Sequence, residues 1–253
     1  MMDKFVMKEV EQDPALEQYS LNKLELLDRL KKQYLNTPTS VCIERSNYLT
    51  QYMKSVEGKN EPVIITRAKA INYYLSNREA LFHDDNLIAG STTSKPLGAP
   101  VYPELMGISI WPELDDIGTR KANPELLTSD EAEILNFEVF PYWIDKTLME
   151  VTRKKLLDEE KELPDGEKHP VMEAFRLMEK IAFFMNGKST VISHTVPYYE
   201  DALHKGLNTM IQEVEARKKM LSSDENDKAD FYEAMQISMK GILNYASNLA
   251  KKA

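Results

Sequence analysis

Apolar residues recur every three or four positions through most of this chain, and that spacing predicts a mainly helical protein. The clearest case runs from Ser20 to Leu35, where leucines fall near one face and charged residues fall opposite. These leucines are Leu21, Leu24, Leu27, Leu30 and Leu35. The same spacing predicts helices over about 43–56, 63–76, 128–139, 147–162, 170–185, 200–221 and 228–253.

Turn and capping residues mark where the helices are expected to begin and end. Pro38 ends the first helix, because the residue before a proline disfavours the helical conformation. Thr128 and Glu131 have the spacing of a capping box. Between the helices, Leu87 to Ala89 is expected to form a short buried strand. Ser91 to Pro103, which is rich in Ser, Thr, Gly and Pro, is expected to be an irregular loop.

Charge and cysteine content narrow the class of protein. The chain carries 32 basic and 41 acidic residues, a formal net charge of -9, and an acidic surface repels phosphate groups. We therefore expect neither nucleic acid nor a membrane as a partner. The single cysteine, Cys42, excludes an intrachain disulfide. The first residues are too polar for a secretion signal and no apolar run has the length of a membrane span, so the expected location is cytoplasmic.

The residues by themselves do not form a complete catalytic signature. Cys42 sits at an expected helix start, where a thiolate is somewhat favoured, but a buried structural thiol is the simpler interpretation. His194 follows Ser193 in an apolar stretch that ends at Pro197. That histidine is either a hydrogen-bonded core residue or a group that lines a pocket. The segment from Tyr102 to Trp111 is an apolar loop, and packing is its simpler interpretation too.

Seven segments, in order along the chain, resemble the N-terminal region of glycyl radical enzymes of the pyruvate formate-lyase superfamily. Each pattern is weak alone, and their shared order makes the resemblance specific. The match looks closer to the dehydratase, lyase and decarboxylase branches than to pyruvate formate-lyase itself. The segments are Cys42 to Thr50, Pro62 to Ala70, Asp85 to Gly90, Gly98 to Glu104, Glu113 to Arg120, Phe140 to Trp143 and Ser193 to Gly206.

The resemblance implies a fold and a domain organisation. Residues 1–40 would be a helical lead-in, and 41–253 would be the N-terminal, mainly helical part of a ten-stranded α/β barrel with few short strands. The family's two finger loops carry a catalytic cysteine and a radical-bearing glycine. Neither loop occurs here: Cys42 matches an N-terminal helix, and no glycine follows the Arg-Val-x-Gly pattern. The expected chain is a fragment or one part of a split enzyme, inactive by itself.

The resemblance also implies an activity, with a second interpretation left open. The family cleaves C–C, C–O or C–N bonds of small molecules by radical chemistry, as lyases, dehydratases, decarboxylases or formate acetyltransferase-like acyltransferases of anaerobic metabolism. The expected partners are the remainder of the enzyme, a small-molecule substrate and a second copy in a homodimer when complete. An S-adenosylmethionine iron–sulfur activase installs the glycyl radical. The alternative is a non-catalytic helical binding or assembly subunit derived from that scaffold.

The resemblance assigns two residues to the substrate. Ser193 and His194 stand where some family members place groups that face the substrate cavity, and a neutral imidazole can orient a hydroxyl or a carboxylate. Tyr198 replaces an aspartate that is common after the proline. No catalytic residue and no metal ligand is expected in this chain.

Overall fold

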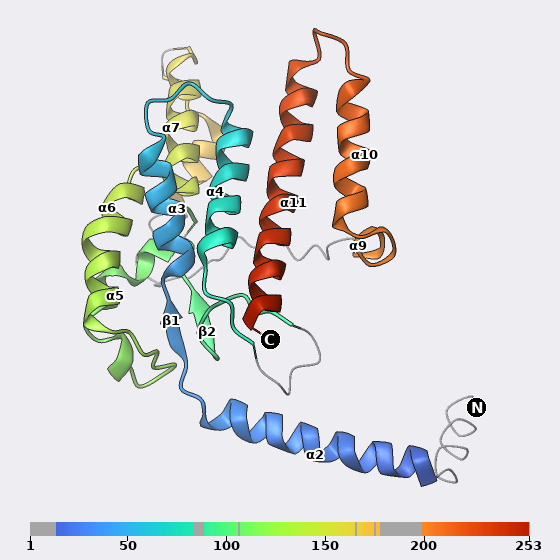
Figure 1. The fold of residues 1–253 in the computed structure, drawn as a ribbon. Coiled ribbons are helices and arrows are strands. Elements are labelled where there is room, and N and C mark those ends of the chain that lie inside the picture. The colour runs from blue at the N-terminus through green and yellow to red at the C-terminus, as the bar shows by residue number, and fades with distance from the viewer. Residues whose placement is uncertain are drawn as a thin grey trace, which may run out of the picture.

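The computed structural model describes residues 14–82, 89–105, 107–164, 166–174, 176–177 and 199–252, with side chains from residue 23 onwards. The described part is mainly helical, as expected (Figure 1). Its α-helices are α2 (Pro14–Asn36), α3 (Glu44–Ser55), α4 (Val63–Asn77), α5 (Ser129–Glu133), α6 (Phe140–Trp143), α7 (Leu148–Lys161), α9 (Glu200–Lys205), α10 (Leu207–Lys219) and α11 (Asn226–Lys252). Two 3₁₀ helices, η1 (Gly107–Glu113) and η2 (Ile117–Thr119), and one π-helix, η3 (Ile134–Val139), complete the helical elements.

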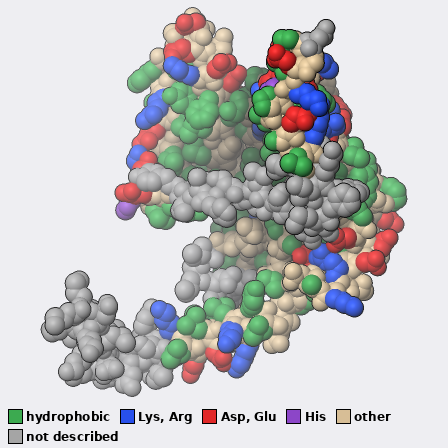
Figure 2. Space-filling view, turned by 180° about the vertical axis from the view of Figure 1, so that it is seen from behind, with side chains coloured by type: hydrophobic (Ala, Val, Ile, Leu, Met, Phe, Trp, Pro, Cys, Tyr) green, Lys and Arg blue, Asp and Glu red, His purple; other side chains and the backbone are tan. Residues whose placement is uncertain are grey.

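The leucine-bearing first helix is confirmed, and it starts earlier than the leucine pattern does. Helix α2 begins at Pro14 and projects away from the other helices (Figure 1). Leu24, Leu27 and Leu35 on this helix are 62%, 52% and 68% exposed. These three side chains are therefore largely uncovered by the described residues, and Figure 2 shows hydrophobic side chains at the surface of this projecting helix.

Two three-residue strands correct the expectation of an irregular loop from Ser91 to Pro103. Strand β1 (Ser40–Cys42) pairs in parallel with β2 (Gly98–Pro100), with Val41 opposite Ala99. Glycine, alanine and proline have low strand propensity, so tertiary pairing and not local preference makes this strand. The strand expected from Leu87 to Ala89 lies mostly outside the described residues.

The main core forms around β1 and the helices of the middle of the chain. It contains aliphatic and aromatic side chains from β1, η2, η3 and α6, among them Val41, Ile117, Leu135, Val139, Phe140 and Trp143. Leu135, Val139 and Phe140 have no exposed surface. Burial of such side chains stabilises a fold by roughly 1.5–3 kcal/mol each.

The helix after Thr128 extends beyond its expected end at Val139. The capping box of Thr128 and Glu131 is present, as the sequence predicts. The helix then widens to a π-helix, in which the Phe140 N–H donates to the carbonyl of Leu135, five residues back. Because Pro141 offers no N–H and its ring crowds the preceding turn, a widened turn lets the chain stay helical to Trp143.

The helix expected from Glu200 to Leu221 is interrupted. Gly206 has a φ of +74° and separates α9 from α10. Glycine adopts this conformation without the steric penalty that a Cβ brings, so one residue can end the first helix and redirect the chain. The final helix is confirmed as α11, and the helix expected from Pro170 is described only up to residue 177, without Phe175.

Helices α4 and α11 pack side by side although they are far apart in the sequence (Figure 1). Their axes come close at Gly241, where an added Cβ would lie 2.9 Å from the Cα of Asn72. The Asn72 side chain donates to the carbonyl of Ile237 at 2.8 Å, and Asn248 donates to the carbonyl of Ser76 at 3.1 Å. This contact brings the C-terminal end of α11 next to the end of α4.

Candidate functional site

The two residues that the resemblance assigns to the substrate, Ser193 and His194, lie outside the described residues. The candidate site is instead the place where other segments of the resemblance meet. Strand pairing joins Cys42 to Pro100, and the indole N–H of Trp143 donates to the Thr50 hydroxyl at 2.8 Å. Three segments that are far apart in the sequence thus share one buried region.

Arg45 and Glu104 form an ion pair at the centre of this region. Arg45 lies in the first turn of α3, directly after β1, and Glu104 lies in the turn that follows β2, so the parallel pairing brings both side chains to the same end. The guanidinium of Arg45 also stacks on the ring of Tyr102, 4.1 Å from its centroid. The carbonyl of Glu104 accepts from the N–H of Leu148 at 2.7 Å, which ties the cluster to the start of α7.

A second arginine, Arg78, lies buried at the C-terminal end of α4. Arg78 is only 5% exposed, and its Nη1 donates to the carbonyl of Thr92 at 3.3 Å. Its guanidinium lies 5.3 Å from the ring centroid of Tyr74 and 4.5 Å from that of Tyr245 on α11. Glu44 lies nearby and accepts from the N–H of Glu79 at 3.0 Å.

Several charged atoms of this cluster are buried without a hydrogen-bond partner among the described residues. They are Glu44 Oε2, Arg45 Nη1, Arg78 Nε and Nη2, and Glu104 Oε2. Buried polar atoms in native proteins nearly always have a partner, so each of these atoms calls for one. We name Glu44, Arg45, Arg78 and Glu104 the buried charge cluster. The fixed charges of the buried charge cluster can bind polar groups.

Two neighbouring side chains, Tyr74 and Cys42, are also buried. Burial raises the pKa of Tyr74 to about 12, so its hydroxyl is a donor at neutral pH. Cys42 is 2% exposed, and its Sγ lies 3.6 Å from the Ser94 hydroxyl oxygen. Cys42 ends β1 and does not start a helix as expected. The interpretation as a buried thiol is confirmed.

The segment from Tyr102 to Trp111 packs against the core, as the sequence predicts. The indole N–H of Trp111 donates to Asn136 Oδ1 at 2.6 Å, and its ring lies 5.4 Å from that of Phe140. Met106 is outside the described residues. In the segment from Glu113 to Arg120, the two end residues are paired at 3.0 Å.

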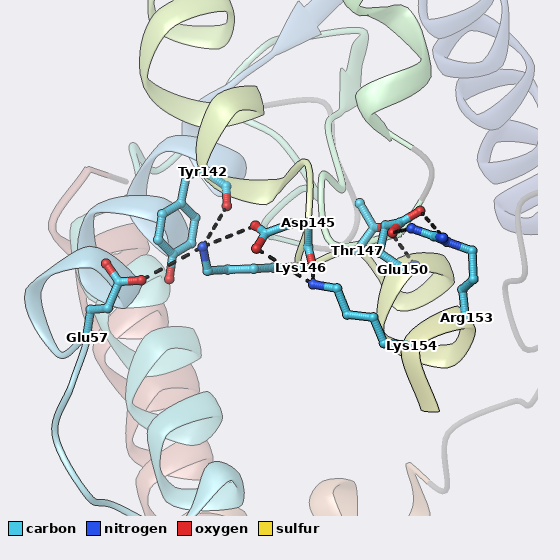
Figure 3. Close-up of polar contacts among 8 residues, drawn as sticks. All are labelled: Glu57, Tyr142, Asp145, Lys146, Thr147, Glu150, Arg153 and Lys154. Carbon is cyan, nitrogen blue, oxygen red and sulfur yellow. Dashed lines mark hydrogen bonds and ion pairs between the residues drawn. The ribbon is translucent and has the colours of Figure 1, made fainter. Parts of the chain in front are cut away.

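The turn between α6 and α7 carries a network of polar side chains with a structural role (Figure 3). Lys146 Nζ donates to the carbonyl of Tyr142 at 3.2 Å and to Asp145 at 3.3 Å, and it lies 3.8 Å from Glu57. Thr147 caps α7 by accepting from the backbone N–H of Glu150 at 3.2 Å. Because these charges are partly exposed, water screens them, and the network fixes the start of α7.

Sequence patterns reveal only part of the buried charge cluster. Glu44, Arg45 and Glu104 lie in segments of the resemblance, but Arg78, Tyr74 and Tyr245 do not. Arg78 follows an ordinary helix end, so no local signal sets it apart. In the described part of the chain, no group of His, Cys, Asp or Glu side chains is arranged to hold a metal ion. Within that same part, no helix combines the length and apolar character needed to cross a bilayer.

Comparison with known proteins places most of this chain in one family of sequences. The family model described as pyruvate formate lyase-like matches residues 20–253. Isethionate sulfite-lyase of Desulfovibrio desulfuricans is 28% identical over 228 residues, which covers 88% of this chain and 26% of that enzyme. Trans-4-hydroxy-L-proline dehydratase of Clostridioides difficile is 27% identical over 235 residues, which covers 90% of this chain and 27% of the relative.

Solved structures show the same relationship. The B12-independent glycerol dehydratase of Clostridium butyricum superimposes with a TM-score of 0.71 at 27% identity, over 90% of this chain and 27% of that one. A glycyl radical enzyme from Archaeoglobus fulgidus has a TM-score of 0.65 at 29% identity, over 85% and 27%. The chain therefore spans about a quarter of the length of the relatives it matches.

Proposed function

This chain belongs to the pyruvate formate lyase-like family, and from that premise we propose that it is the N-terminal portion of a glycyl radical enzyme. Its relatives are lyases and dehydratases, which makes radical bond cleavage on a small molecule the activity of the complete enzyme. The observation that carries the proposal is the family match over residues 20–253 together with the structural agreement with glycerol dehydratase.

The molecules on which the relatives act indicate the substrate class. Isethionate, trans-4-hydroxy-L-proline, glycerol and sulfopropanediol are all small hydroxylated molecules. We assign a small hydroxylated substrate to the complete enzyme, with the lyase and dehydratase branches favoured over formate acetyltransferase-like chemistry. Ser193 and His194 are the proposed contacts to a substrate hydroxyl, because an imidazole and a hydroxyl each donate and accept hydrogen bonds without adding a fixed charge.

The described residues supply structure to the reaction and not its chemical centre. No glycine in the 253 residues has the radical-loop pattern, and Cys42 is buried beside β2. The glycyl radical then resides in the remainder of the enzyme, where the activase installs it. This part of the enzyme excludes water from one wall of the pocket, which protects radicals from quenching. A cytoplasmic location and a homodimer of complete subunits belong to the same proposal.

A chimera tests this function directly. Residues 20–253 would replace the matching segment of the Desulfovibrio desulfuricans isethionate sulfite-lyase, and the chimera would be activated without oxygen. The expected result is a glycyl signal in electron paramagnetic resonance together with bond cleavage of a hydroxylated substrate.

The melting temperature and the glycyl signal of the chimera separate failure to fold from loss of function. A folded chimera that carries the radical and converts none of the substrates named above would overturn the proposal in favour of a non-catalytic binding or assembly subunit.

A further inference from the structure

One edge of the Arg78 guanidinium makes no hydrogen bond to the described residues. Its Nη1 donates to the carbonyl of Thr92, whereas Nε and Nη2 have no partner among the described residues. The N–H bonds of Nε and Nη2 point the same way in the plane of the group, with a spacing that matches two oxygens of one oxyanion. At 5% exposure, Arg78 is a buried cation with an unused bidentate fork.

Two tyrosine rings set the position of this fork before any ligand arrives. The guanidinium lies within 4.5 Å of the Tyr245 ring centroid and 5.3 Å of the Tyr74 ring centroid. Both hydroxyls are tied to the backbone of the neighbouring loop, Tyr74 to the carbonyl of Thr92 and Tyr245 to the carbonyl of Ser91, each at 3.4 Å. The aromatic faces stabilise the positive charge and keep the guanidinium from rotating.

Glu44, which contacts the backbone of the neighbouring Glu79, makes no hydrogen bond to the fork. Glu44 uses Oε1 to accept from the N–H of Glu79, and its Oε2 is itself without a partner among the described residues. Glu79, the residue after Arg78, instead pairs with Lys252 at 2.9 Å. A buried cation is strongly unfavourable without a partner, and the described residues supply no counter-ion to this fork, so the fork calls for an anion.

We propose that the Nε and Nη2 edge of Arg78 binds a small oxyanion, a carboxylate or a sulfonate. The shape of the fork selects a group with two coplanar oxygens over a spherical ion such as chloride. The anion is carried by a free small molecule or by a side chain of the joined polypeptide in the complete enzyme. The inference rests on the geometry of Arg78 and stands apart from the proposed reaction.

The test uses the 253-residue chain with its arginine side chains labelled with ¹⁵N. Sodium acetate and sodium isethionate are titrated at constant ionic strength against sodium chloride, while the Nε–Hε resonance of Arg78 and the melting temperature are followed. The expected result is a saturable shift of that resonance and a melting temperature that rises with anion concentration. Chloride alone is expected to produce neither change. An Arg78 resonance that does not move would overturn the proposal.

Variants distinguish an anion that binds Arg78 from solution from an ion pair between Arg78 and Glu44. Arg78→Met is expected to abolish the rise in melting temperature, whereas Arg67→Met, at an exposed arginine on the same helix, is expected to retain it. Glu44→Gln removes a nearby negative charge and is expected to tighten anion binding about tenfold, or about 1.4 kcal/mol. If Glu44→Gln instead destabilises the chain as much as Arg78→Met and acetate has no effect, Glu44 is the partner and the proposal is wrong. The resonance titration needs no variant, so the test holds even if Arg78→Met fails to fold.

The chimera with isethionate sulfite-lyase distinguishes the two sources of the anion, a free small molecule and a side chain of the joined polypeptide. An Arg78 resonance that still responds to free anion identifies a small-molecule site. A resonance that is already shifted and unresponsive identifies a carboxylate of the joined polypeptide. Both results retain the oxyanion assignment, while an unshifted and unresponsive resonance contradicts it.

Discussion

The indole N–H of Trp143 donates to the hydroxyl of Thr50 at 2.8 Å, and the two residues are 93 positions apart in the chain. Thr50 donates in turn to the carbonyl of Ser46 at 2.6 Å. Both Thr50 and Trp143 are buried, with 2% and 8% of their surface exposed. The hydroxyl therefore satisfies two buried groups at once and locks α6 onto α3.

Thr50→Val tests this link. Valine keeps the shape but leaves the Trp143 N–H buried without an acceptor, and we expect the free energy of unfolding to fall by about 1–3 kcal/mol. Chemical denaturation followed by tryptophan fluorescence measures the change. Thr119→Val is the control, because the Thr119 hydroxyl makes an exposed bond to Asp116 within one turn. Equal effects of the two changes would show that the buried bond contributes nothing specific.

Gly241→Ala tests the close approach of α4 and α11. Helix propensity alone predicts a gain of about 1 kcal/mol from alanine. The new Cβ would lie 2.9 Å from the backbone of Asn72, and we expect an overpacking penalty of about 1–3 kcal/mol. The variant should therefore melt at or below the wild-type temperature. Gly118→Ala, where the nearest atom is 3.7 Å away, should change little. A more stable Gly241→Ala variant would contradict the packing.

The raised pKa of Tyr74 predicts that the folded chain loses stability at alkaline pH. Burial raises its pKa in the folded chain to about 12, above the usual value near 10. A group with a raised folded pKa contributes stability that is complete below its unfolded pKa and is lost as pH rises through the folded pKa. We expect the free energy of unfolding to fall between about pH 10 and pH 12. Tyr74→Phe should flatten that fall, and Phe in place of the exposed Tyr34 should not.

The isolated chain is expected to form no glycyl radical. Its 253 residues lack the radical-loop pattern, so an activase has no glycine to act on. The chain would be incubated without oxygen with S-adenosylmethionine and a competent activase and examined by electron paramagnetic resonance. A full-length relative treated in the same way should show the glycyl doublet. A doublet from this chain would refute the assignment of the radical to the remainder of the enzyme.

His194→Ala tests the proposed substrate contact within the chimera. If the imidazole orients a substrate hydroxyl, turnover should fall about a hundredfold, or about 2.7 kcal/mol, with the melting temperature unchanged. His204→Ala, at an exposed histidine in the last turn of α9, is the matched control and should leave turnover intact. A destabilised His194→Ala chimera with unchanged turnover per folded molecule would make His194 a structural residue.

Periodicity and capping were enough to locate most of the helices. Helices α3, α4, α7 and α11 begin and end within a few residues of their expected bounds, because apolar spacing and helix-end signals act locally. Family resemblance added what periodicity could not, namely the identity of the scaffold and the proposal that Ser193 and His194 contact the substrate.

Long-range contacts account for the features that local patterns missed. Strand β2 has the composition of a loop and exists because β1 offers it a backbone partner 58 residues away. The Glu200 to Leu221 segment divides at Gly206, since a glycine inside a helical pattern is compatible with both continuation and a turn. Arg78 meets Tyr245 across 167 positions because Gly241 lets α11 approach α4. Local sequence specifies which segments are helical, whereas packing between distant segments decides which charged side chains become buried together.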